Sequence, residues 1–253
     1  RLNAKPIANP GPERRVFKGG SVTFEPEVSD SDGTVVEYLW DFGNGETSSE
    51  VRPSCSYRAL GEYTVTLKVK DNDGKWSEPG TTHVTVTNTA SGELTMDEDW
   101  EGEASISGDI TVPKGITLRL KPGTKMDFTG KYKVLVYGKI LIEGIAGNPI
   151  VIGANTNAWD GIRLINAEAG SVIRYAEIHL ATAGAVVSES DLTIENCLFK
   201  GNRIGLHILK SAPTVKKCTF EANLIYGVKE DDQAKPTMKD CRFINNLTVD
   251  YYE

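Results

Sequence analysis

Three stretches near the end of the chain decide the fold of its larger part: residues 194–202 read IENCLFKGN, residues 215–223 read VKKCTFEAN, and residues 238–246 read MKDCRFINN. Each has an apolar first residue, cysteine at the fourth position, phenylalanine at the sixth and asparagine at the ninth. A weaker copy, IRYAEI, occupies residues 173–178, so the copies start 21, 21 and 23 residues apart. Self-similarity at such a period predicts a solenoid in which each repeat is one coil.

The coils are predicted to be built from β-strands. No stretch sustains the i, i+3, i+4, i+7 apolar spacing of an amphipathic helix, whereas short apolar runs are separated by Gly, Pro and Asn turns. Together with the copies above, the upstream runs predict about seven coils. These upstream runs are residues 110–112, 116–120, 126–128, 134–136, 140–142, 150–152 and 162–164.

Stacking of the coils predicts three inward columns. Cys197, Cys218 and Cys241 form the first, and we expect buried thiols because parallel stacked side chains do not easily reach the torsion of a disulfide. The phenylalanines at 199, 220 and 243 form the second. The asparagines at 202, 223 and 246 form an amide ladder, which takes precedence over the glycosylation sequon at residues 246–248.

The first third of the chain has a different pattern. Residues 21–28 (SVTFEPEV), 63–70 (YTVTLKVK) and 83–87 (HVTVT) alternate between apolar and polar types, as half-buried strands do. The intervening segments SDSDG (29–33), FGNG (42–45) and DNDG (71–74) are typical of turns. Short strands with this punctuation predict an antiparallel sandwich, in which Trp40 and Phe42 anchor the core and Gly43 and Gly45 permit the turn.

Both parts resemble known families. NAKPIA (3–8), SDSDG, WDFGNGE (40–46), PSCSY (53–57), GEYTV (61–65) and DNDG occur in the order of a polycystic-kidney-disease (PKD) domain, with departures at Asn44 and Cys55. VPKGITLRLKPGT (112–124), GKILIEG (138–144) and WDGIRL (159–164) resemble right-handed parallel β-helix proteins. These resemblances imply an all-β fold class, and we expect an immunoglobulin-like β-sandwich (PKD) over residues 1–89, then a right-handed parallel β-helix solenoid over residues 90–253.

Composition excludes several functions. The formal charge is −7 without a basic block, so the electrostatic footprint of nucleic-acid binding is missing. No apolar run reaches the roughly 18 residues of a membrane span. The four cysteines lack both a disulfide framework and zinc-ligand spacing.

A catalytic site would require paired carboxylates, or carboxylates beside a base, on outward columns. One outward column contains Arg163, His207 and Lys229, with Val186 between; another contains Arg174, Glu195, Lys216 and Lys239. Neither column places two carboxylates on adjacent coils. Asp231 and Asp232 lie in the insertion KEDDQAKP (229–236), which is predicted to be a solvated loop.

Two kinds of binding site remain. Sugar rings stack on aromatics beside polar groups, which makes Trp100, Trp159, Arg163, His207 and Lys229 candidate glycan contacts; a cap on the first coil is the alternative role of Trp100. Asp30, Asp32, Asp71 and Asp73 supply oxygen ligands for calcium if their loops converge, and the PKD resemblance adds Asn3 as a further ligand.

These observations predict a non-catalytic extracellular or cell-surface segment, structural, adhesive or glycan-binding. The PKD-like unit would be a spacer or docking module, and the β-helix would present an extended face to a polysaccharide, a cell-surface glycan or another surface protein. The alternative is a carbohydrate-active enzyme (lyase, hydrolase or epimerase) acting on acidic polysaccharide, with Arg163, His207 and Lys229 contacting substrate carboxylates.

Overall fold

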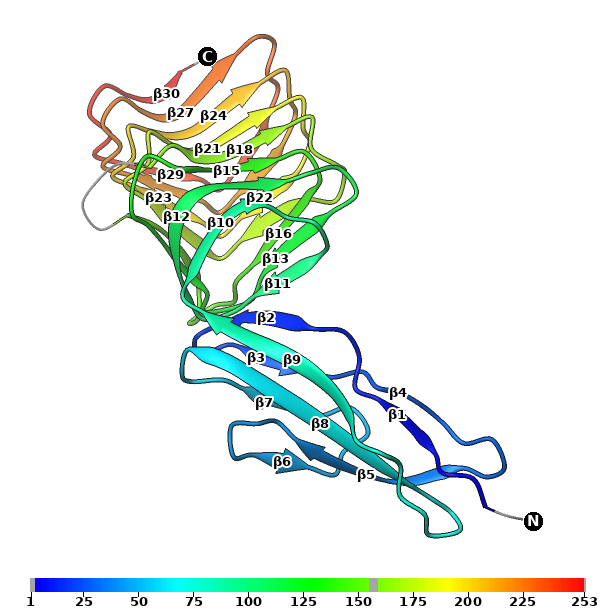
Figure 1. Cartoon of the computed structure of the whole chain (residues 1–253). Coiled ribbons are helices and arrows are strands. Elements are labelled where there is room, and N and C mark those ends of the chain that lie inside the picture. The colour runs from blue at the N-terminus through cyan, green and yellow to red at the C-terminus, as the bar shows by residue number, and fades with distance from the viewer. Residues whose placement is uncertain (1–2, 155–158, 253) are drawn as a thin grey trace. The chain divides into compact units, whose positions relative to one another are not determined.

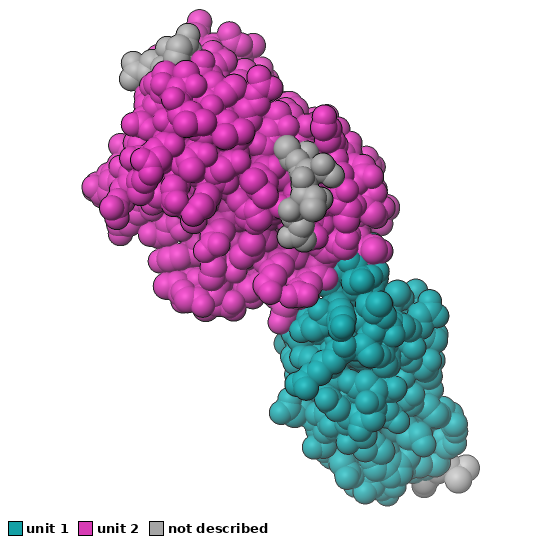
Figure 2. All heavy atoms as spheres, turned by 90° about the vertical axis from the view of Figure 1, so that its left-hand side faces the viewer, with its two compact units in different colours: residues 1–88 teal, residues 89–253 magenta. Residues whose placement is uncertain are grey.

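The computed structural model describes residues 3–154 and 159–252, and the chain divides into two compact units, residues 1–88 and 89–253 (Figure 2). Within the described ranges the secondary structure is all strand, and no helix is present that could cross a membrane. The prediction of an all-β protein is confirmed.

The first unit is a β-sandwich. A five-stranded sheet has the order β2-β9-β8-β5-β6, and the pairs β1-β4 and β3-β7 complete it; every pairing is antiparallel except that of β2 with β9. Alternate residues of the long strands are buried, as the sequence predicted. The strands are β1 (Ile7–Asn9), β2 (Arg14–Phe17), β3 (Ser21–Thr23), β4 (Glu27–Ser29), β5 (Val35–Asp41), β6 (Thr47–Ser48), β7 (Ser54–Ser56), β8 (Gly61–Asp71) and β9 (Gly80–Thr87).

The segment WDFGNGE is a core anchor followed by a turn. The side chains of Trp40 and Phe42 are buried at 0% and 2% exposure, with ring centroids 6.2 Å apart. Gly43 and Gly45 have φ of 73° and 90°, the left-handed region that costs glycine little. The backbone N–H of Gly43 donates to the Asp41 carboxylate at 2.9 Å, which closes the turn.

The two departures from the PKD pattern contact each other. The side-chain amide of Asn44 donates to Sγ of Cys55 at 3.2 Å, and Oδ1 of Asn44 accepts from the backbone N–H of Glu46 at 3.0 Å. Burial raises the pKa of the Cys55 thiol, which therefore stays protonated at neutral pH. The pair is a neutral polar contact at the edge of the core.

The second unit is a parallel β-helix with three faces of stacked strands (Figure 1). We call these faces A, B and C in the order in which the chain passes through them. The long strand β12 (Glu103–Val112) pairs with β10 (Thr89–Glu93) and takes part in both face B and face C. Face A consists of β11 (Glu98–Trp100), β13 (Thr117–Leu120), β16 (Lys139–Glu143), β19 (Val172–Arg174), β22 (Thr193–Glu195), β25 (Thr214–Lys216) and β28 (Thr237–Lys239).

The other two faces follow face A in every coil. Face B consists of β14 (Lys125–Phe128), β17 (Ile150–Gly153), β20 (Ala176–His179), β23 (Leu198–Lys200), β26 (Thr219–Glu221) and β29 (Arg242–Ile244). Face C consists of β15 (Lys133–Val136), β18 (Gly161–Ile165), β21 (Ala183–Ser188), β24 (Ile204–Leu209), β27 (Tyr226–Asp231) and β30 (Val249–Tyr252). Successive strands of each face pair in parallel, which confirms the predicted solenoid of about seven coils.

Single left-handed residues make the corners of the C-terminal coils. A chain that leaves one face for the next must turn sharply, and one residue in the αL region does so without interrupting the adjacent strands. These residues have φ between 45° and 63°. They are Tyr175, Asn196, Lys217 and Asp240 between faces A and B; Leu180, Gly201, Ala222 and Asn245 between B and C; and Asn166, Glu189, Lys210 and Asp232 between C and A, where Asp232 is followed by a second left-handed residue, Gln233.

The predicted inward columns are present. The rings of Phe199 and Phe220 stack with centroids 5.1 Å apart, and Phe220 and Phe243 follow at 5.2 Å. All of the column cysteines are free thiols; Cys197 and Cys218 are buried, and Cys241 in the last coil is only partly so. The predicted buried thiols are therefore confirmed for the first two.

The asparagine ladder lies at the corner between faces B and C. Asn202 and Asn223 are fully buried at 0% exposure, and each also donates to a backbone carbonyl of the preceding coil, Ile178 and Phe199 respectively. The amide of Asn246 donates to the carbonyl of Phe220 at 3.0 Å and to the Asp250 carboxylate at 2.9 Å, so a glycan on this nitrogen would replace one of these two hydrogen bonds. The ladder is confirmed, and the absence of glycosylation stays a prediction.

Candidate functional site

The predicted basic column lies on the outside of face C. The strand register pairs Arg163 with Val186, Val186 with His207, and His207 with Lys229 on four consecutive strands, β18, β21, β24 and β27. Their side chains face outward because the alternate residues on these strands, such as Leu164 and Ile208, are buried in the interior. The geometry of the column is therefore as predicted, and its role in binding stays a prediction.

This column forms one side of a groove with a volume of about 410 Å³. The rest of its lining comes from residues at the start of the same strands and at the corner before them, among them Thr182, Arg203 and Tyr226, which sequence reasoning did not single out. A detectable signal existed for Arg203, because it directly follows the ladder residue Asn202 and therefore lies at the edge of face C. We call this surface, between Arg163 and Lys229, the face C groove.

Asp231 links two residues of the groove. Its Oδ2 accepts hydrogen bonds from Nε2 of His207 at 2.8 Å and from Nζ of Lys229. The hydrogen bond from Lys229 and, to a lesser extent, that from His207 lower the pKa of the Asp231 carboxyl. Together they outweigh its partial desolvation, which raises the pKa. The prediction that Asp231 belongs to a solvated loop is wrong, because β27 continues to this residue and brings its carboxylate beside His207.

At the other end of the groove, Arg163 faces Asp160. The guanidinium lies 3.9 Å from the Asp160 carboxylate and 3.5 Å from its carbonyl oxygen. Oγ1 of Thr182 lies 3.5 Å from the same carboxylate. These separations are long for charge-assisted hydrogen bonds, so an anionic ligand could compete for Arg163.

Neither tryptophan is available to a sugar. The prediction that Trp100 and Trp159 contact a glycan is therefore wrong. Trp159 is fully buried: its ring stacks on Phe128 with centroids 4.1 Å apart, and Nε1 donates to the His179 carbonyl at 2.9 Å. Trp100 is 4% exposed, and its Nε1 donates to Glu98 at 2.6 Å. Stacking on a sugar requires an open ring face, which these side chains do not offer.

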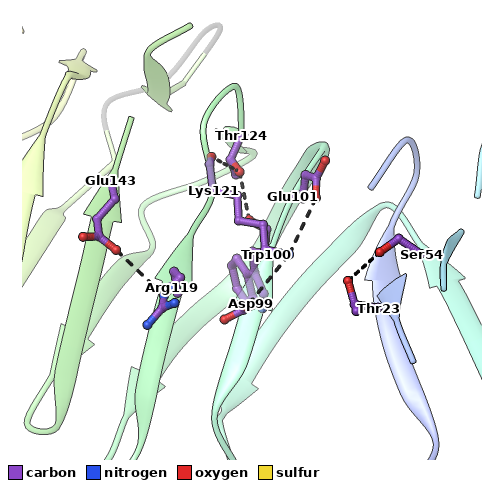
Figure 3. A network of polar contacts seen from close by, with 9 residues as sticks. All are labelled: Thr23, Ser54, Asp99, Trp100, Glu101, Arg119, Lys121, Thr124 and Glu143. Atoms are coloured by element: carbon purple, nitrogen blue, oxygen red, sulfur yellow. Dashed lines mark hydrogen bonds and ion pairs between the residues drawn. The ribbon is translucent and has the colours of Figure 1, made fainter. Parts of the chain in front are cut away.

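Trp100 instead belongs to the framework of the first coil. Its carbonyl accepts the hydroxyl of Thr124 at 2.9 Å, and the ammonium of Lys121 lies 3.7 Å from Asp99 and 3.8 Å from Glu101 (Figure 3). The Trp100 side chain is buried at the start of the stack of coils. This position is consistent with the alternative role predicted for Trp100, which is to close the first coil.

The acidic loops of the sandwich come together at one end. The amide of Asn3 donates to Asp71 at 3.0 Å, and the backbone N–H of Ala4 donates to Asp32 at 3.1 Å. Oδ1 of Asp71 also accepts from the backbone of Asp73 and of Lys75 at 3.0 and 2.7 Å. Desolvation raises the pKa of the Asp71 carboxyl, but these hydrogen bonds together outweigh it and lower the pKa.

These contacts are those of loop caps, and they leave calcium binding a prediction. Oδ1 of Asp30 accepts a long hydrogen bond, 3.5 Å, from the backbone of Asp32, and Asp73 is exposed. Among residues 3–154 and 159–252, no three His, Cys, Asp or Glu side chains are grouped as they would be around a metal ion. Binding at Asn3, Asp30, Asp32, Asp71 and Asp73 would therefore require their carboxylates to rearrange.

A second hollow, of about 540 Å³, lies on face B under the segment that follows β16. Its lining contains two acids, Glu177 and Glu221, and two bases, Lys217 and Arg242. It contains none of the predicted site residues. Because its charges balance, it favours neither sign of ligand.

Comparison with known proteins identifies both units. Residues 3–87 match the model of the PKD domain, and residues 142–250 match that of the right handed beta helix region. The pre-pro-metalloprotease PrtV of Vibrio cholerae is 54% identical over 57 residues, 22% of this chain and 6% of that protein. A microbial collagenase of Vibrio alginolyticus is 38% identical over 91 residues, 36% of this chain and 11% of the collagenase. The chain therefore spans only about a tenth or less of these relatives.

Among solved structures, the PKD1 domain of Vibrio anguillarum Epp is 41% identical. It aligns over 34% of this chain and 100% of that domain, with a TM-score of 0.28.

Proposed function

Because residues 3–87 form a PKD domain and residues 142–250 a right-handed β-helix, we propose that this chain is a non-catalytic extracellular segment that binds glycan through its β-helix. The PKD domain would be a spacer or docking module, and face C would present the binding surface. The homology to segments of a metalloprotease and of a collagenase supports an accessory role outside the cell, where collagen is found.

One observation carries the proposal: the face C groove gathers Arg163, Arg203, His207 and Lys229 on a chain whose formal charge is −7. A basic groove on an acidic protein concentrates anionic ligands at that place. The polar and aromatic side chains of Thr182 and Tyr226 add hydrogen-bonding and stacking groups of the kinds that recognise sugars.

The test is binding of the intact chain to a broad glycan array, in millimolar calcium and again in chelator. We expect binding in both conditions that is lost in the double variant Arg163→Gln/Lys229→Gln. The matched control is Lys239→Gln, which removes an exposed cation from face A. Silence of the wild-type chain on every glycan would contradict the proposal and direct the search to a protein partner.

A second candidate, a carbohydrate-active enzyme acting on acidic polysaccharide, is favoured by the hydrogen bond between His207 and Asp231 in the same groove as Arg163. An imidazole oriented by a carboxylate is a common general base or acid. Incubation with uronate polymers, with and without calcium, tests it. Release of unsaturated product that is abolished by Arg163→Ala or Lys229→Ala would establish the enzyme and overturn the non-catalytic proposal.

A further inference from the structure

The hollow on face B, of about 540 Å³, extends along the stack of coils, and we call it the face B hollow. Four residues on consecutive strands line it: the strand register pairs Glu177 with Leu198, Leu198 with Thr219, and Thr219 with Arg242. Their side chains face outward, because the alternate residues of these strands, such as Phe199, are buried in the interior. The column therefore has an acid at one end and a base at the other.

The two charges at the ends of this column are far apart. Neighbouring strands of a sheet are about 4.8 Å apart, so Glu177 on β20 and Arg242 on β29 are separated by roughly 14 Å along the axis. An extended polypeptide advances by about 3.3 Å per residue, so this separation corresponds to about four of its residues. A single amino acid or another small zwitterion is too short to meet both charges.

The charges that a ligand would meet are not neutralised by the protein. Within the described ranges, the side chains of Glu177 and Arg242 are exposed and have no hydrogen bond or ion pair, and the same is true of Lys217 at the corner beside the column. The Glu221 carboxylate, which also lines the hollow, is already paired with Lys200 at 2.8 Å. A ligand with only one sign of charge would therefore be repelled at one end of the hollow.

The groups between the two ends are suited to a polypeptide backbone. The hydroxyl of Thr219 and the side-chain amide of Asn196 are half-buried and have no hydrogen-bond partner in the described part of the chain. Both can donate to a peptide carbonyl and accept from a peptide N–H. Leu198, in the middle of the column, and Ile145, which is 53% exposed at the rim, add apolar surface for side chains.

We propose that the face B hollow binds an extended segment of a partner protein, which lies along the stack with a basic side chain against Glu177 and an acidic side chain against Arg242 and Lys217. Charge complementarity identifies this occupant, because a short polypeptide carries both signs of charge at such a spacing, whereas uronate and sulfate glycans carry only one. The hollow lies on a different face from the face C groove. The proposal therefore goes beyond the glycan-binding function and does not depend on it.

The experiment selects peptides from a random display library on the full chain, after depletion of the library on the double variant Glu177→Gln/Arg242→Gln. We expect the selected peptides to share a basic and an acidic residue about four positions apart, as the separation along the stack requires. Fluorescence anisotropy then measures the affinity of one labelled peptide. Glu177→Gln and Arg242→Gln should each weaken its binding about two- to fivefold, as the loss of one exposed ion pair implies.

A charge exchange tests the assignment of each end. The variant Glu177→Lys/Arg242→Glu should bind the peptide in which the basic and acidic residues are exchanged more tightly than the selected peptide. Lys239→Gln on face A and Glu62→Gln in the first unit remove exposed charges outside the hollow and should leave the affinity unchanged. Circular dichroism and the melting temperature of each variant show whether it is folded.

Each contrary result overturns a stated part of the proposal. Failure to select any peptide, or selection of peptides with only one sign of charge, would overturn the class of ligand. Peptides that bind Glu177→Gln and Arg242→Gln as tightly as the wild-type chain would bind outside the hollow. Unchanged affinity of a peptide whose basic and acidic residues are made adjacent would overturn the extended conformation. Stronger competition by partially N-deacetylated hyaluronate, a glycan with both signs of charge, than by unlabelled peptide would assign the hollow to a glycan.

Discussion

The side-chain amide of Asn202 donates to Oδ1 of Asn223 at 3.2 Å, and the same oxygen accepts the backbone N–H of Asn202 at 3.1 Å. One buried carbonyl oxygen therefore satisfies two donors of the preceding coil, while the amide of Asn223 donates to the carbonyl of Phe199 at 3.1 Å. At this corner between faces B and C, the side chain of Asn223 accepts the backbone N–H of Asn202, while the flanking backbone N–H groups of Gly201 and Arg203 still donate to carbonyls of neighbouring coils.

Asn223→Ala should destabilise the β-helix strongly. It leaves at least two buried backbone groups, the N–H of Asn202 and the carbonyl of Phe199, without their side-chain partner, at a cost of about 2–5 kcal/mol in the free energy of unfolding. Urea unfolding measures it. The control is Asn148→Ala, an exposed asparagine of the same unit, which should change stability by less than about 0.5 kcal/mol. Equal effects would show that the ladder contributes little.

The ladder was predictable from sequence because its period equals the period of the coil. In a parallel stack, residues at equal places in successive repeats become neighbours, so the spacing of Asn202, Asn223 and Asn246 was sufficient. The same rule placed Arg163, His207 and Lys229 in one column. The sandwich was predictable from its alternating strands and from turns such as that at Gly43 and Gly45.

Gly205→Ala should destabilise the protein by a steric mechanism. A Cβ at this position would lie 2.4 Å from the carbonyl oxygen of Gly227 and 2.9 Å from Cδ1 of Phe220, so the neighbouring coil must shift. We expect a cost of about 3 kcal/mol or more, measured by thermal or urea unfolding. Gly147→Ala is the comparison, because its Cβ would meet nothing within 4 Å and only its φ of 82° is unfavourable, worth about 1 kcal/mol. A cost at Gly205 no larger than that at Gly147 would contradict the close packing.

The cysteine column should be unreactive in the folded protein. A hydrogen bond to Cys197, together with burial, raises the pKa of the Cys218 thiol, and a hydrogen bond to Cys218, together with burial, raises that of Cys241. Since the thiolate is the nucleophile, a disulfide reagent at about pH 8 should react slowly before unfolding and fully afterwards. The variant Cys55→Ser confines the signal to the column. Rapid reaction of the native protein, or an intact mass lower by two hydrogens, would contradict buried free thiols.

The parts of the site that sequence did not reveal depend on where strands end and which way rings point. Asp231 lies in a polar insertion, and nothing in its composition shows that β27 extends to this residue and places the carboxylate 2.8 Å from His207. From the sequence alone, an aromatic side chain at Trp159 is as suited to a sugar as to the core; its contact with Phe128 decides for the core. Periodicity predicts neighbours along a stack, and it does not predict contacts made by the ends of strands or across the interior.

Calcium at the acidic loops of the sandwich is the last prediction. The loops at residues 29–33 and 71–74 are adjacent, as the hydrogen bond of 2.7 Å from the backbone N–H of Thr34 to the side-chain oxygen of Asn72 shows, so one ion could gather their carboxylates if these side chains rearrange. Calcium that binds only the folded state would raise the melting temperature in proportion to the logarithm of its concentration. Hydrogen exchange should then slow in these loops and stay unchanged in residues 89–253. Asp30→Ala should abolish both effects, whereas Asp99→Ala, an exposed carboxylate of the other unit, should leave them intact. If millimolar calcium changes neither the melting temperature nor the hydrogen exchange of the wild-type chain, the carboxylates do not bind calcium. Asp32 and Asp71 then serve only to cap their loops through the hydrogen bonds that they already accept.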